Sequence, residues 1–106
     1  MTEEATLILC TAPDEEKGAE LARGLVEAKL AACVNIVPGL RSFYVWKGAL
    51  QDDREVQLFI KTRPELSERV EEWLAEHHPY EVPEILFVPI RGGSVAYLGW
   101  VRDQTI

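Results

Sequence analysis

The chain has 106 residues, of which 47% are hydrophobic and 27% charged, with a formal net charge of −7. This length suits one hydrophobic core, so we expect a single domain over residues 1–106. The negative charge argues against nucleic acid and anionic membranes as partners, because phosphate binding needs clustered Lys and Arg. No apolar run approaches the roughly 20 residues that cross a bilayer. The acidic start MTEEATLILC does not resemble a signal peptide, so the sequence predicts a cytoplasmic protein.

Strand and helix patterns alternate along the first half of the chain. The apolar run from Ala5 to Thr11 predicts a buried strand, and apolar residues at helical spacing predict a helix over about Asp14 to Leu30. Ala32 to Trp46 follows as a long extended segment, in which Pro38-Gly39 predicts a bulge or bend. A turn is expected from Gly48 to Asp53.

The second half continues the alternation. Residues Glu55 to Thr62 alternate in polarity and predict a third strand, and the apolar stripe from Leu66 to His77 predicts a second helix. A fourth strand is expected from Glu84 to Ile90, followed by a short helix with Ser94 as its N-cap. Gly99 lies inside that last helix, which we expect to fray because glycine costs about 1 kcal/mol there relative to alanine.

Two similar junctions support this order of elements. LILCTAPDE and LFIKTRPEL each run from a strand through Thr, any residue, Pro and an acid into a helix, which is typical of a capping box. The order β-α-β-β-α-β with a C-terminal helix predicts an α+β ferredoxin-like sandwich with an antiparallel sheet in the strand order 4-1-3-2. Helices would cover only one face of that sheet, yet the strands are apolar on both faces. We therefore expect another copy of the chain to cover the second face.

Cys10, His77 and His78 are candidate metal ligands. In the predicted topology the first strand and the second helix run in the same direction, so all three residues lie at one end of the sandwich. A thiolate with imidazoles suits copper or zinc, and Pro79 frees His78 from helical geometry. In the alternative, the histidines end a helix, His77 packs on the apolar stripe and Cys10 fills the core. Cys33 lies at the opposite end, so no disulfide with Cys10 is expected.

Catalytic chemistry has weaker support. His78 could form an acid/base pair with Glu81 or Glu84, but surface carboxylates are usually only solvated. The chain has no nucleophile-elbow signature and no recognisable cofactor motif. We therefore do not expect an enzyme.

The chain resembles the CutA divalent-cation-tolerance family over nearly its whole length. The resemblance is carried by CTAPDE, LVEAKLAACVNIVPGLRSFYVWKG, EVQLFIKT, HHPYEVPEI and YLGW. It implies a homotrimer with the architecture of the PII signalling proteins, in which the long second and third strands form a hairpin that extends sheets between subunits. It also implies a cytoplasmic protein that is linked to tolerance of copper and other divalent cations and has no established enzymatic reaction.

Two functional hypotheses follow. The family's copper ligands are the cysteine before T-A-P-D-E and the histidines of H-H-P-Y, so the resemblance implies a site for copper (Cu²⁺), or for Zn²⁺ or another divalent cation, at Cys10, His77 and His78. The second hypothesis is a PII-like regulator or scaffold that binds a small metabolite or a partner protein in clefts between subunits. The residues expected near the rim of such clefts are Tyr44, Trp46, Tyr80, Glu81 and Glu84.

Overall fold

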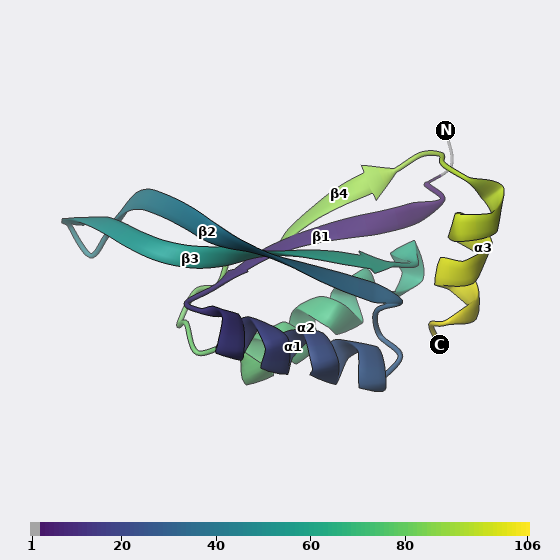
Figure 1. The fold of residues 1–106 in the computed structure, drawn as a ribbon, viewed down its shortest axis with the longest axis horizontal. Coiled ribbons are helices and arrows are strands. Elements are labelled where there is room, and N and C mark those ends of the chain that lie inside the picture. Colours follow the sequence, from purple (N-terminus) through teal and green to yellow (C-terminus); the bar gives the residue numbers. More distant parts are fainter. Residues whose placement is uncertain (1–2) are drawn as a thin grey trace.

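The computed structural model describes residues 3–106 and has the predicted α+β fold class. Its elements are β1 (Ala5–Ala12), α1 (Glu15–Glu27), β2 (Cys33–Trp46), β3 (Ala49–Thr62), the 3-10 turn η1 (Pro64–Leu66), α2 (Ser67–His77), β4 (Leu86–Ile90) and α3 (Val95–Asp103). The sheet order β2-β3-β1-β4 is the predicted one, and every neighbouring pair is antiparallel. Helices α1 and α2 lie side by side against one face of the sheet (Figure 1).

The core lies between that face and the two helices. The register places Ile8 opposite Ile60 and Cys10 opposite Leu58, so alternate residues of β1 and β3 point to the same side. All four side chains are fully buried. They pack in one cluster with apolar residues of α1 and α2, namely Leu21, Leu25, Val70 and Leu74.

The two helix starts differ from the predicted capping boxes. Thr11 and Thr62 are strand residues in the structure, so neither caps a helix. The N-cap of α1 is Asp14, whose carboxylate accepts a 2.7 Å hydrogen bond from the backbone N–H of Lys17. The hydroxyl of Thr62 instead donates a 2.6 Å hydrogen bond to the carbonyl oxygen of Leu30, which ties β3 to the segment after α1.

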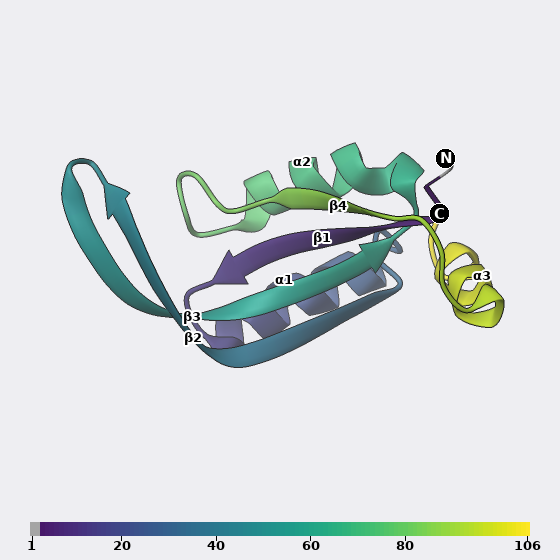
Figure 2. The same cartoon turned by 90° about the horizontal axis from the view of Figure 1, so that it is seen from above.

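Strands β2 and β3 form a hairpin that extends well beyond the rest of the fold (Figures 1 and 2). The turn predicted from Gly48 to Asp53 is wrong, because β3 already begins at Ala49. Lys47 and Gly48 make the whole turn with φ values of 51° and 79°, the left-handed conformation that two-residue hairpin turns require. The bulge predicted at Pro38-Gly39 is confirmed by a shift in register between Val37 and Leu40.

The sheet face opposite α1 and α2 remains largely uncovered. Helix α3 lies at one end of the molecule (Figure 1). Just after it, the Thr105 hydroxyl accepts a 2.9 Å hydrogen bond from the Arg63 guanidinium. Leu86 is 53% exposed and Val88 38% exposed. Within residues 3–106 no helix is long and apolar enough to span a membrane.

Candidate functional site

His78 is a buried residue whose two ring nitrogens both make hydrogen bonds. Helix α2 ends at His77, and His78 is extended with ψ 141°, as expected of a residue before proline. Its Nδ1 accepts from the backbone N–H of Tyr80 at 3.1 Å, and its Nε2 lies 2.7 Å from the carbonyl oxygen of Thr11. A carbonyl only accepts, so Nε2 carries the proton and the ring is neutral. Burial lowers the pKa of His78, which favours this neutral form.

Cys10 lies in the core and holds its proton. The side chain is fully buried in β1. Burial, followed by the charges of Glu84 and Glu55, raises the pKa of the Cys10 thiol to about 12. Its Sγ lies 3.6 Å from the Thr11 carbonyl oxygen, as a weak donor would. Because a metal ligand must be a thiolate, this environment opposes coordination.

His77 is exposed, whereas the helical pattern placed it on the apolar stripe of α2. Its ring stacks on Trp73 at a centroid distance of 3.9 Å, and its Nδ1–H donates to the Trp73 carbonyl oxygen at 2.7 Å. The backbone after α2 explains why His78, and not His77, is buried. Pro79 takes His78 out of the helix, and the extended chain turns the His78 ring under β1.

The three predicted metal ligands are therefore only partly together. Cys10 and His78 contact the same Thr11 carbonyl oxygen, whereas His77 points outward. Nowhere in residues 3–106 do three His, Cys, Asp or Glu side chains gather as a metal site would require. In this geometry the Cys10 thiol is protonated and both ring nitrogens of His78 are hydrogen-bonded, so each would have to change before it could coordinate an ion.

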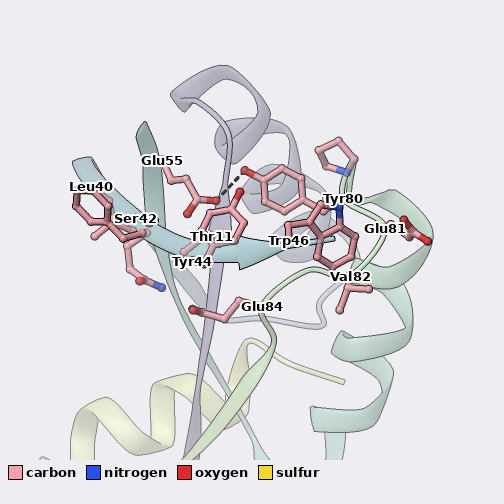
Figure 3. A pocket seen from close by; sticks show the side chains of 13 residues that line it. Thr11, Leu40, Ser42, Tyr44, Trp46, Glu55, Tyr80, Glu81, Val82 and Glu84 are labelled. Atoms are coloured by element: carbon pink, nitrogen blue, oxygen red, sulfur yellow. Dashed lines mark hydrogen bonds between the residues drawn. The ribbon is translucent and has the colours of Figure 1, made fainter. Parts of the chain in front are cut away.

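A hollow lies between the extended hairpin and the loop that joins α2 to β4 (Figure 3). We call it the hairpin cleft. Its cavity volume is about 740 Å³. The lining residues are Thr11, Leu40, Ser42, Phe43, Tyr44, Trp46, Glu55, Gln57, Pro79, Tyr80, Glu81, Val82 and Glu84. Four of them are aromatic and three are carboxylates.

Glu55 and Tyr80 connect the two sides of the hairpin cleft. Glu55 is only 7% exposed, and its Oε2 accepts a 2.7 Å hydrogen bond from the Tyr80 hydroxyl (Figure 3). Burial raises the pKa of Tyr80 well above its usual value, and the bond to Glu55 raises it further. On the hairpin, the Tyr44 hydroxyl donates to Asp53, and this bond is the main cause that raises the pKa of Tyr44 to about 12.

The sequence identified the rim of this cleft but not its buried centre. All five expected rim residues line the cavity, although here they surround a cleft within a single chain. Glu55 was read only as the first residue of a strand. No local pattern marks it, because its partner Tyr80 lies 25 positions away and the fold alone brings the two together.

A family model described as "CutA1 divalent ion tolerance protein" matches residues 6–104. The chain belongs to this CutA1 family. Protein CutA of Arabidopsis thaliana, named chloroplastic, is 48% identical over 99 residues, or 93% of this chain and 54% of that protein. The divalent-cation tolerance protein CutA of Yersinia pestis is 42% identical over 102 residues, or 96% of this chain and 86% of that protein. The chain thus spans about half the length of the plant CutA relatives.

Solved structures of CutA1 proteins show the same fold. The Thermus thermophilus protein has a TM-score of 0.91 and 44% identity, covering 95% of this chain and 98% of that one. CutA1 from Oryza sativa has a TM-score of 0.93 and 43% identity, and the match covers 96% of this chain and 94% of that one. The family is named for tolerance of divalent ions and not for a reaction.

The comparisons contradict the predicted cytoplasmic location. The plant CutA relatives are named chloroplastic, and a CutA structure from Archaeoglobus fulgidus, 36% identical with a TM-score of 0.91, is named periplasmic. The prediction is therefore wrong. It relied on the composition of the domain and its first residues, whereas targeting is carried by separate segments that leave no mark on the domain itself.

Proposed function

We propose that this chain serves divalent-cation tolerance as a PII-like regulatory or scaffold protein that binds a small molecule in the hairpin cleft. The observation that supports this function best is a cavity of about 740 Å³ that contains a carboxylate with 7% exposure. Small-molecule sites are typically concave, roughly 300–1,000 Å³ in volume, and combine apolar walls with a few fixed polar groups. The aromatic walls and the Glu55–Tyr80 pair match that description.

A thermal-shift screen of small metabolites tests this function. A ligand at about 100 times its dissociation constant stabilises a protein by about 2.7 kcal/mol, which is readily measured. Stabilisation should be lost in Glu55→Gln and in Trp46→Ala, which change two separate positions on the hairpin side of the cleft. Glu71→Gln is the matched control, because it removes the same charge from an exposed position of α2. A ligand whose effect survives both cleft substitutions would show that binding occurs elsewhere.

We also propose that the chain forms a homotrimer. Large apolar side chains that are exposed in the single chain support this proposal. On the hairpin, Val45 is 67% and Leu50 74% exposed, in addition to the uncovered sheet face. Exposed apolar surface of this extent is typical of subunit interfaces. Light scattering should give three times the 12.0 kDa mass of the chain. A monomeric mass at micromolar concentration would contradict the trimer.

Direct copper binding by Cys10, His77 and His78 is a second candidate function. The observation in its favour is that Cys10 Sγ and His78 Nε2 contact one carbonyl oxygen, at 3.6 Å and 2.7 Å. For both to coordinate an ion, the thiol must lose its proton and His78 must release Thr11 or Tyr80. Metal-free protein titrated with Cu(I), Cu(II) and Zn(II) tests it. Cys10→Ser and His78→Ala should each weaken binding at least about tenfold, and unchanged affinity in both variants would overturn this candidate.

A further inference from the structure

We infer that the ligand of the hairpin cleft is a small organic cation, bearing an ammonium or guanidinium group. This inference rests on the function proposed above and specifies the class of molecule that the cleft takes. The charges lining the cavity are Glu55, Glu81 and Glu84, and no Lys, Arg or His from residues 3–106 lines it. A nucleotide or another anion entering this cavity would meet three carboxylates and no compensating cation.

Glu55 supplies the central binding group. A carboxylate with only 7% exposure is costly to bury unless hydrogen bonds or a cation compensate it. Tyr80 satisfies its Oε2. No hydrogen bond to its Oε1 is found in the described residues, and no buried polar side-chain atom there lacks a partner, so Oε1 is reached by solvent and can meet a ligand. An ammonium or guanidinium donor there would make a charge-assisted hydrogen bond.

Aromatic rings supply the second element of cation recognition. Phe43 is one of the residues that line the cleft. Tyr44 and Trp46 line it from the hairpin, and Tyr80 lines it from the opposite loop (Figure 3). The faces of such rings attract organic cations at centroid distances of about 6 Å or less. Carboxylates and aromatic faces together favour a cation that also has apolar surface.

One cation of the chain, Lys47, lies outside the cavity lining but beside two residues that belong to it. The Lys47 ammonium lies 5.8 Å from the centroid of the Trp46 ring and 3.8 Å from a carboxylate oxygen of Glu81. Both Lys47 and Glu81 side chains are mostly exposed there. This internal pair places an ammonium between an aromatic face and a carboxylate, which is the arrangement we infer for the ligand deeper in the cavity.

The spacing of the carboxylates favours an organic cation over a bare metal ion. A divalent ion needs several oxygen ligands within about 2–2.6 Å of one point. The described residues contain no such cluster, and the three carboxylates are spread around a cavity of about 740 Å³. A molecule of several heavy atoms can reach separated carboxylates and fill the apolar space between them.

Isothermal titration calorimetry with probes of different charge tests the inference. The probes are agmatine and spermidine as organic cations, glucose as a neutral molecule and ATP as an anion. We expect agmatine or spermidine to bind and Glu55→Gln to weaken that binding at least about tenfold, or about 1.4 kcal/mol. Lys47→Gln should leave it unchanged or tighten it, because a competing ammonium is removed.

Two controls separate specific binding from general attraction to an acidic protein. Glu71→Gln changes the net charge equally and should alter affinity by less than about twofold. Tyr80→Phe should weaken binding while preserving charge, and circular dichroism checks that each variant is folded. Equal weakening by Glu71→Gln and Glu55→Gln would overturn the inference.

The remaining outcomes distinguish this inference from the function on which it rests. If ATP or glucose binds in a manner that depends on Glu55 and Trp46, the cation is the wrong class but the cleft remains a ligand site. If the cationic probes do not bind and no compound in the thermal-shift screen stabilises the protein, both fail.

Discussion

The Tyr80 hydroxyl donates a 2.7 Å hydrogen bond to the carboxylate of Glu55, and this contact joins the loop after α2 to strand β3. The raised pKa of Tyr80 keeps the hydroxyl protonated, so it remains a donor throughout the neutral range. The bond holds both sides of the hairpin cleft at a fixed separation. Its loss should therefore affect both stability and ligand binding.

Tyr80→Phe should lower the free energy of unfolding by about 1–2 kcal/mol, because the buried Glu55 carboxylate loses its donor. Urea denaturation measures this change. Tyr44→Phe is the matched control, since it removes a tyrosine-to-carboxylate bond on the more exposed hairpin, where Tyr44 is 41% exposed. Its cost should be clearly smaller than that of Tyr80→Phe. Equal costs in the two variants would contradict a special role for the Glu55 bond.

The Cys10 thiol should resist alkylation in the folded protein. With a pKa of about 12 in place of 9.0, it has about a thousandfold less thiolate at a given pH, and it is fully buried. Cys33→Ser isolates Cys10 for the measurement. This variant should react slowly with iodoacetamide when native and rapidly in urea. Rapid reaction of the native variant would show that Cys10 is accessible as a thiolate, and would strengthen the copper candidate.

His78 should make the fold less stable in mild acid. Its folded pKa is lowered and its unfolded pKa is near 6.5, so below about pH 6.5 the unfolded chain takes up a proton before the folded chain does. The contribution of His78 to the free energy of unfolding is fully present above that pH and declines as the pH falls toward the folded pKa. His78→Gln should remove the decline between about pH 7.5 and 5.5, whereas His77→Gln should retain it. Urea unfolding across this range tests both.

Hydrophobic alternation in the sequence correctly predicted the strand segments that pack against the helices. Residues Glu55 to Thr62 alternate because one face of this half of β3 meets α1 and α2. The half from Ala49 to Arg54 belongs to an exposed arm without a buried face, so no alternation marks it and a turn was predicted there. Hydrophobic alternation marks a strand only where one of its faces is buried, so it does not reveal a strand that is stabilised by backbone pairing alone.

The candidate site shows a similar limit. Helical periodicity assigned His77 to the core and left His78 out, but the geometry after Pro79 reverses the two. The Glu55–Tyr80 contact depends on the folding of segments 25 residues apart, which no motif records.

Two glycines in helices should respond oppositely to the same substitution. Gly99 has open space around its Cβ position, so Gly99→Ala should stabilise α3 by about 0.5–1 kcal/mol. A Cβ at Gly24 would collide with the Trp73 ring, which is itself stacked on His77. Gly24→Ala should therefore destabilise by about 1–3 kcal/mol despite the better helix propensity of alanine. Thermal unfolding measures both, and stabilisation by Gly24→Ala would show that α1 and α2 pack less closely than described.

The most direct test of the account is the fluorescence of Trp46 during a titration with agmatine. Trp46 lines the hairpin cleft, and replacing Trp73 and Trp100 with Phe makes it the only reporter. If agmatine binds in the hairpin cleft, its titration should give a saturable change in Trp46 fluorescence that Glu55→Gln removes and Glu71→Gln preserves. A Trp46 signal that stays constant while the same sample binds agmatine by calorimetry would place the ligand outside the cleft and contradict the account.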